Sequence, residues 1–174
     1  MKTALNSKRL MPLAAILAML FLAPGAANAQ TPQRTSATYG DWTLSCAVAA
    51  NGSKSCGLIH LVKQGNVAAA QISFGRSSKS GHFTATVQIA ANVWLATGLK
   101  IAFADDTPAL SAPFEWCLSV RCLAEFDLVE ADVKRLRSQK EPARVVYKNA
   151  LQTDMTLPMT FVGFDDAVNA LEKQ

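Results

Sequence analysis

The stretch WTLSCAVAANGSKSCGL, residues 42–58, carries the signals that decide the fold, because two cysteines flank a turn inside an apolar segment. Asn51-Gly52 is a dipeptide typical of the tight turn of a β-hairpin. Such a turn places Thr43-Leu44-Ser45-Cys46 antiparallel to the apolar segment from Leu58 to Val62, and it brings Cys46 close to Cys56. We therefore predict a hairpin that a disulfide can cross.

Four cysteines are present, and an even number in an exported chain predicts disulfides. Three pairings are possible, and we favour Cys46–Cys56 with Cys117–Cys122 because each partner is close in sequence. A bridge that closes about ten residues stabilises a fold by roughly 2–3 kcal/mol. A structural zinc site usually has a C-x2-4-C pair at both ends, and Cys46 and Cys56 are too far apart for one. Cys117-x4-Cys122 is not a redox C-x-x-C motif, so we expect no metal, no other cofactor and no catalytic dithiol.

The segments outside this hairpin also read as short strands. Phe83, Ala85, Val87 and Ile89 alternate with small polar residues, as in a strand with one buried face. Further candidate strands are Val67–Phe74, Leu99–Phe103, Cys122–Phe126, Arg144–Tyr147 and Met155–Phe161, in which Pro158 marks a sheet edge or a bulge. Many short strands separated by turns predict a mainly β chain with an antiparallel sandwich or barrel.

Two segments have helical periodicity instead. Apolar residues recur at helical spacing at Leu128, Val129, Val133 and Leu136, with acidic residues early and basic residues late. The C-terminal segment repeats the pattern at Phe164, Ala167, Val168 and Leu171. We expect one or two short helices that pack on the sheet.

The N-terminal segment is typical of an export signal. Lys2, Lys8 and Arg9 precede the apolar run from Leu10 to Ala23, and Ala27-Asn28-Ala29 is a cleavage site for a signal peptidase. We predict a signal peptide over residues 1–29 and one domain over 30–174, with Gln30–Thr38 as a frayed tail. An uncleaved anchor is the alternative, but the run is short for a span of about 20 residues and no later segment is apolar enough to cross a bilayer. The predicted location is periplasmic, with the cell surface or secretion as further destinations.

Removal of this signal changes the charge of the chain. The full sequence has 17 basic and 13 acidic residues, and three basic residues lie in the predicted signal peptide. The remaining 14 basic and 13 acidic residues give a net charge of +1, so the basic pI does not indicate a nucleic-acid partner.

Residues with catalytic chemistry are scattered. His60 and His82 have no companion at metal-ligand spacing, and the H-E-x-x-H and G-x-S-x-G motifs are absent from the sequence. Two pairs of adjacent carboxylates have structural explanations. Asp105-Asp106 lies in a predicted turn, and Asp165-Asp166 lies at the predicted start of a helix, where acidic residues are favoured. We therefore expect a protein that binds and is not an enzyme. The alternative is a periplasmic small-ligand binder or an enzyme built from His60, His82 and nearby carboxylates.

Three residues are candidates for contact with a partner. The loop from Gly75 to Gly81 contains Arg76 and Lys79 but lacks the order of a phosphate-binding loop, so we interpret it as a hairpin loop able to meet an anionic surface. Trp94 is either a core plug under a crossover loop or an exposed aromatic anchor for a partner or a membrane. We expect the partner to be a protein or an envelope component.

The ordered motifs of the chain resemble the invasion-associated locus B family. Its members open with a G-D-W-x-x-x-C run, matched by Gly40-Asp41-Trp42 through Cys46, and a second cysteine follows at Cys56. Phe114-Glu115-Trp116-Cys117 with Cys122-Leu123-Ala124 is similar to the second cysteine pair, and the closing segment is similar from Leu157 to Ala167. Arg121 stands where members often have glycine, and Ala91-Asn92-Val93 where they often have Pro-Leu-Gly.

The resemblance implies an immunoglobulin-like antiparallel β-sandwich outside the cytoplasm with no known catalytic site. It also implies an association with bacterial entry into host cells, although many members occur in bacteria that invade nothing. The expected function is that of a non-enzymatic, exported envelope protein, and a virulence-associated host-interaction factor is the form that the family name suggests.

Overall fold

The computed structural model describes residues 33–77, 80–105 and 107–174, which belong to one compact unit over Thr31–Gln174. The predicted signal peptide lies outside the described residues. The strands in chain order are β1 Gln33–Tyr39, β2 Trp42–Val48, β3 Lys54–Gln64, β4 Val67–Arg76, β5 Phe83–Ala90, β6 Leu99–Ala102, β7 Leu110–Ala112, β8 Phe114–Cys117, β9 Arg121–Leu128, β10 Ala143–Lys148 and β11 Asp154–Met159. The helices are a 3-10 turn η1 at Leu95–Thr97, α1 at Glu130–Ser138 and α2 at Phe164–Glu172.

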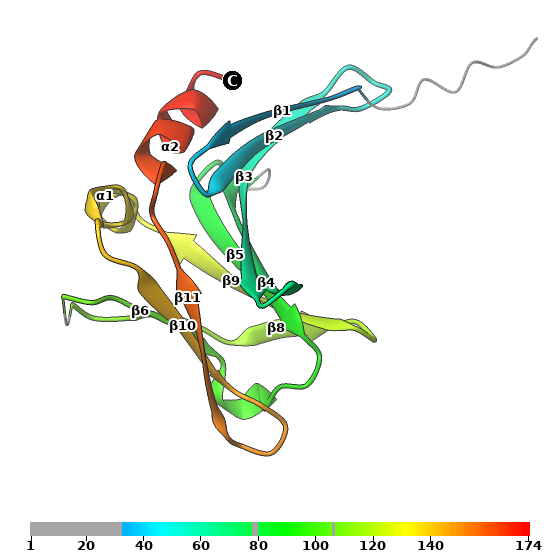
Figure 1. The fold of residues 1–174 in the computed structure, drawn as a ribbon. Helices are drawn as coiled ribbons and strands as arrows, with labels where there is room; N and C mark the ends of the chain where they lie inside the picture. Colours follow the sequence, from blue (N-terminus) through cyan, green and yellow to red (C-terminus); the bar gives the residue numbers. More distant parts are fainter. Residues whose placement is uncertain (1–32, 78–79, 106) are drawn as a thin grey trace, which may run out of the picture. The chain divides into compact units, whose positions relative to one another are not determined.

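Two antiparallel sheets form the fold (Figure 1). The larger sheet has the order β1-β2-β3-β4-β5-β9-β8, and the smaller has the order β11-β10-β6-β7. Strands β1 to β5 follow one another as a meander, because each hairpin turn returns the chain beside the strand just made. The predicted fold class, a mainly β antiparallel sandwich with short helices, is confirmed.

The core lies between the inner faces of the two sheets and is closed by the helices. The alternation predicted in β5 is seen directly, since Ala85, Val87 and Ile89 are buried while the residues between them are not. The smaller sheet contributes Ile101 and Val145, which lie opposite each other and are fully buried. Burial of such side chains is the main stabilising term of the fold.

The hairpin of residues 42–58 forms as predicted. Cys46 lies opposite Cys56 in the ladder between β2 and β3. The backbone N–H of Gly52 donates to the carbonyl of Ala49 at 2.9 Å, and Gly52 has a φ of 81° that suits glycine.

The predicted frayed tail is wrong where the structure describes it. Residues 33–39 form β1, the edge strand that pairs with β2 from Gln33↔Val48 to Tyr39↔Trp42. Six of its seven residues are exposed, so the strand is held by backbone hydrogen bonds and has no apolar alternation that a sequence could reveal. The strands β7 and β8 were also not predicted.

The predicted helices form, with one correction in the first. Leu128 is the buried last residue of β9, and Val129 is exposed just before α1, so the buried residues of the helix are Val133 and Leu136. The Asp132 carboxylate accepts a hydrogen bond from the backbone N–H of Val129 at 3.3 Å, which fixes the start of α1. Helix α2 buries Phe164, Ala167, Val168 and Leu171, the four residues predicted.

The first turn of the domain interlocks with the segment before α2. The backbone N–H of Asp41 donates to the carbonyl of Val162, and the Trp42 indole N–H donates to the carbonyl of Thr160, each at 3.0 Å. Thr160 Oγ1 donates to the Asp41 carboxylate at 2.9 Å. We call residues 40–42 with 160–163 the terminal clasp.

Glycine is required on both sides of the terminal clasp. A Cβ on Gly163 would lie 2.2 Å from the carbonyl oxygen of Tyr39, and a Cβ on Gly40 would lie 2.5 Å from that of Val162. Both glycines also have positive φ, 79° and 55°. Trp42 is fully buried, and its ring centroid lies 4.7 Å from that of Phe164. The clasp therefore joins the opening and closing motifs of the sequence.

Pro158 lies in β11, at the edge of the smaller sheet, as its presence in a strand predicts. Over the described residues, every helix is too short or too polar to cross a bilayer.

Candidate functional site

The cysteines are bonded as Cys46–Cys56 and Cys117–Cys122, the local pairing favoured by the hairpin argument. Each bridge joins residues directly opposite on neighbouring strands, β2 with β3 and β8 with β9. With all four sulfur atoms in bridges, no cysteine is free to act as a thiolate.

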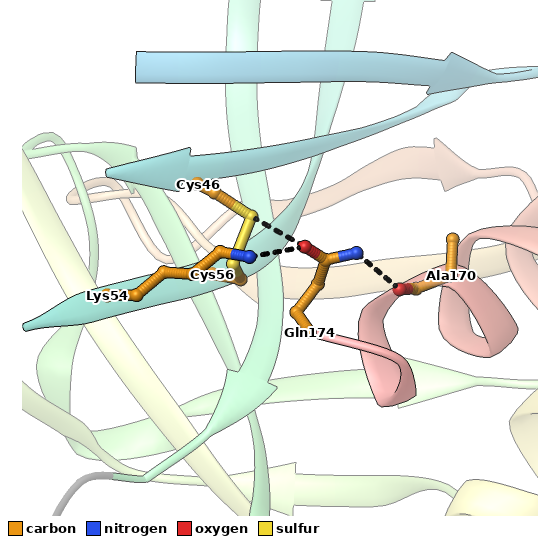
Figure 2. Close-up of a disulfide and its surroundings, with 5 residues drawn as sticks. All are labelled: Cys46, Lys54, Cys56, Ala170 and Gln174. Carbon is orange, nitrogen blue, oxygen red and sulfur yellow. Dashed lines mark hydrogen bonds between the residues drawn. A yellow bond between two sulfur atoms is a disulfide. The ribbon is translucent and has the colours of Figure 1, made fainter. Parts of the chain in front are cut away.

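The end of the chain covers the first disulfide (Figure 2). Gln174 Oε1 accepts a hydrogen bond from Lys54 Nζ at 2.7 Å and lies 3.8 Å from Cys46 Sγ. The Gln174 amide nitrogen donates to the carbonyl of Ala170 at 3.1 Å, which folds the side chain back onto α2. The disulfide sulfur carries no proton, so its contact is one of packing. The disulfide therefore forms part of the surface against which Gln174, two residues after the end of α2, packs.

Arg76 lies in an open groove of about 540 Å³ whose wall includes His82 and Lys134. Its guanidinium carbon lies 4.1 Å from the ring centroid of Phe83, and Nη1 donates to the carbonyl of Gly81 at 3.1 Å. The stacking holds the cation over an aromatic face, and Arg76 is exposed to solvent. Glu130 and Glu172 also line the groove, and Glu172 is paired with Arg137, so Arg76 and Lys134 are the cations there that form no ion pair within the described residues.

A second arginine that lines this groove, Arg137, is bonded to three side chains of α2. Arg137 donates to the carboxylates of Asp165 at 2.6 Å and Glu172 at 3.3 Å, and to Asn169 Oδ1 at 2.5 Å. The pKa of Arg137 is raised, first by the hydrogen bond to Asp165 and then by the negative charge of both carboxylates. Arg137 therefore joins α1 to α2. Lys79, the other predicted cation, lies outside the described residues.

His60 lies in a second open groove of about 600 Å³, which also includes Asp41, Lys63 and Thr160. The imidazole is 6% exposed, stacks on Trp42 with centroids 5.2 Å apart, and places Nδ1 3.0 Å from the carbonyl oxygen of Asp41. These contacts connect His60 to the terminal clasp. A buried histidine that is stacked and hydrogen-bonded has a full structural role.

The two histidines do not come together. His60 lines one groove with Asp41, whereas His82 lines the other with Glu130. Within residues 33–77, 80–105 and 107–174, no three histidine, cysteine, aspartate or glutamate side chains converge as metal ligands. Each histidine lines a separate groove that is open to solvent.

The paired carboxylates have local structural roles. Asp105 accepts hydrogen bonds from the hydroxyl of Thr107 at 2.7 Å and from its backbone N–H at 3.2 Å, and these bonds lower the pKa of Asp105. Asp165 and Asp166 occupy the first turn of α2, where the helix dipole favours negative charge. Asp106 lies outside the described residues.

Trp94 is exposed, at 39%, and its neighbour Val93 is the residue that fills the core. The backbone N–H of Trp94 donates to the carbonyl of Lys148 at 2.8 Å, and Val93 forms a bridge with Asn149. These contacts hold the crossover between β5 and β6 against the loop between β10 and β11, and the Trp94 side chain remains exposed there.

Other exposed apolar side chains surround Trp94. Eight of the ten large apolar residues that are exposed in the described part of the chain lie at this end of the domain. They are Leu61, Val67, Trp94, Leu95, Trp116, Leu118, Val120 and Leu151. We call these eight residues the apolar loop end; the connecting segments there are 65–66, 91–98, 118–120 and 149–153.

Backbone contacts hold these segments together. The N–H of Ala91 donates to the carbonyl of Val120 at 3.2 Å, which links the β5–β6 crossover to the β8–β9 turn. Leu61 and Val120 line the same shallow hollow of about 170 Å³ over β3, β4, β5 and β9. The Trp94–Lys148 hydrogen bond adds the β10–β11 loop. The apolar loop end is therefore one continuous region.

Sequence reasoning identified only Trp94 in this region. One signal was available, since Leu118, Val120 and Leu151 are apolar residues outside the predicted strands and helices, in connecting segments where polar residues are usual. The assembly of the region was not predictable from spacing, because its residues come from four separate parts of the chain.

Comparison with known proteins gives the family. The family model described as invasion associated locus B (IalB) protein matches residues 42–172. No curated protein matches the chain. The crystal structure of invasion associated protein B from Bartonella henselae is similar in fold, with a TM-score of 0.70 and 17% sequence identity, covering 80% of this chain and 95% of that chain.

The family match begins at Trp42 and ends in α2, so it includes Trp42, the 160–163 side of the terminal clasp and both disulfides. It confirms the resemblance seen in the opening, middle and closing motifs. The chain belongs to the invasion associated locus B (IalB) family.

Proposed function

We propose that the protein is an exported component of the bacterial envelope that acts by binding a protein or another envelope component, and not by catalysis. Membership of the IalB family supports this proposal, and so do the two disulfides, which are typical of chains that fold outside the cytoplasm. We infer a periplasmic location, with cell-surface exposure or secretion as the route to a host-interaction role.

The apolar loop end is the observation that carries the proposal. Leu151 is 84% exposed and Val120 is 68% exposed, and a folded chain gains nothing from leaving such side chains together in water. Clustered exposed apolar residues mark surfaces that become covered by a partner. Trp94 and Trp116 add aromatic anchors of the kind found at binding hot spots.

A photo-crosslinking amino acid placed at Leu151 tests this function in cells. The expected result is a specific adduct with one envelope component after irradiation. The matched control is the same crosslinker at Val162, which is 62% exposed but lies in the terminal clasp. Equal adducts from both positions, or none from either, would remove the apolar loop end as the binding surface.

The groove of Arg76, His82 and Lys134 supports a second candidate function, the binding of a small anion. Titration of labelled protein with inorganic phosphate, followed by NMR, tests it. Saturable shifts at His82 that disappear in Arg76→Gln would support this function, and shifts at Arg76 and His82 no larger than at distant residues would exclude phosphate as its ligand.

A further inference from the structure

We propose that the apolar loop end docks on the surface of a lipid bilayer with anionic headgroups. This inference rests on the proposed function, because it names the envelope component that the surface binds. Four features of the described residues support it. The connecting segments at this end are uncharged, their leucines are highly exposed, the aromatic residues are tryptophans, and the flanking charged residues are mostly basic.

The connecting segments at this end carry no charge. Segments 65–66, 91–98, 118–120 and 149–153 contain neither a basic nor an acidic residue, and their polar members are small or neutral, such as Asn92 and Ser119. A charged side chain is costly to move toward the acyl region, whereas neutral loops enter the headgroup layer at low cost. The composition of the tips therefore suits an interface of lipid and water.

The exposed residues themselves are those that partition into this layer. Leu151 at 84%, Leu118 at 58% and Leu95 at 57% exposure project from three different segments. Trp94 and Trp116 are also exposed, at 39% and 47%, and an indole ring is the side chain that favours the level of the headgroups. Exposed side chains on several separate loops can contact a flat surface at the same time, and the surface of a membrane is flat on this scale.

The charged residues that flank these segments in the chain are more often basic than acidic. Lys63, Lys100 and Arg121 have no ion pair in the described part of the chain, and Lys148 is paired with Asp154 at 2.7 Å. Glu115, beside Trp116, is an acid near these segments that forms no ion pair with another described residue. The local excess of positive charge complements anionic headgroups, each cation near such a surface adding to the attraction.

The hollows of this region are small for a ligand pocket. The hollow between Leu61 and Val120 has a volume of about 170 Å³, which is below the several hundred Å³ typical of a ligand pocket. A second one, lined by Thr97, Gly98 and Lys148, has a volume of about 250 Å³. The apolar side chains stand on separate projections around it. A partner protein is therefore the alternative outcome of the test.

Flotation of the exported protein with vesicles tests the proposal. The protein is purified after processing by the cell, and its mass must show that the apolar segment Leu10–Ala23 is absent, because that segment would bind lipid itself. Vesicles of phosphatidylethanolamine with phosphatidylglycerol are compared with vesicles of phosphatidylcholine alone. We expect flotation with the anionic vesicles, weaker flotation with the neutral ones, and loss of the difference at high salt.

Tryptophan fluorescence adds a readout within the region. The chain has three tryptophans, and Trp42 is fully buried in the clasp, so a change on adding vesicles reports Trp94 and Trp116. We expect a blue shift and quenching by brominated lipid. The double variant Trp94→Phe, Trp116→Phe keeps the apolar character and must lose the signal while still floating.

A matched pair of double variants decides the location of the surface. Leu118→Ser with Leu151→Ser should lower the partition coefficient by about tenfold or more, because two apolar side chains no longer enter the interface. Val129→Ser with Val162→Ser removes two side chains of similar exposure, 64% and 62%, away from this end and should change it by less than about twofold.

The outcomes separate this inference from the proposed function. Absence of flotation with anionic vesicles, together with a protein adduct from position 151 in the crosslinking experiment, overturns the lipid assignment and leaves binding by this surface intact. Absence of both overturns the two proposals together. Equal loss in the two double variants would also contradict the assignment.

Discussion

Apolar residues are buried near one end of β11 and exposed near the other. At its last residues β11 leads into the terminal clasp, where Trp42 is fully buried and its indole N–H is hydrogen-bonded to Thr160. Before its first residue lies the apolar loop end, where Leu151 is 84% exposed. One end closes the fold, and the other leaves apolar surface uncovered. The difference indicates that stability and binding are carried by separate parts of the domain.

The largest expected effect breaks the clasp. Trp42→Ala removes a fully buried indole, its hydrogen bond to Thr160 and its contact with Phe164, and should lower the free energy of unfolding by about 3–5 kcal/mol. Trp94→Ala is the matched control, with an expected cost of about 1 kcal/mol. Urea unfolding measures both, and equal costs would contradict the separation of roles.

The next effect concerns glycine. Gly163→Ala should cost about 3 kcal/mol, because a Cβ would lie 2.2 Å from the carbonyl oxygen of Tyr39 at a φ of 79°. Gly65 also has positive φ, 61°, but a Cβ added there would have no other atom within 4 Å. Gly65→Ala should therefore cost only the backbone term of about 1 kcal/mol. A similar loss from both substitutions would show that crowding at the clasp is unimportant.

Each disulfide should contribute slightly less to the free energy of unfolding than Gly163 does. Removing Cys46–Cys56 by a double change to alanine should cost about 2–3 kcal/mol, and removing Cys117–Cys122, which closes a shorter loop, about 2 kcal/mol. Peptide mapping without reduction should recover these two pairs. Recovery of a crossed pair would refute the local pairing.

The smallest effect on stability is expected at the apolar loop end. Leu151→Ser should change the free energy of unfolding by less than about 0.5 kcal/mol, because the side chain is already in water. Leu157→Ser, in the same β11 region but 2% exposed, is the control and should cost several times more. A large loss from Leu151→Ser would mean that this leucine packs within the fold and is not free for a partner.

The comparison also shows what the sequence could predict. Strand β5 and helix α2 were predictable, because Val87 and Phe164 each belong to an apolar pattern with the period of its element. Strand β1 was not, since six of its seven residues are exposed and its pairing with β2 uses backbone groups alone. Val129 matched the helical period and yet precedes α1, because the chain turns there from β9 into the helix.

The candidate site was less predictable than the fold. Trp94 was singled out because of its type, but whether it plugs the core depended on the hydrogen bond to Lys148 and on the burial of Val93. The companions of Trp94 were not found, because a surface assembled from several loops leaves no spacing in the chain. The glycines of the clasp were visible as motifs, but their mutual contact was not.

Hydrogen–deuterium exchange with and without native envelope membranes tests the separation of the two ends most directly. The separation of the two ends predicts slower exchange in 91–98, 118–120 and 149–153 when membranes are present, and unchanged exchange in 40–42 and 160–163. Protection confined to the groove of Arg76 and His82, with none at the apolar loop end, would contradict it.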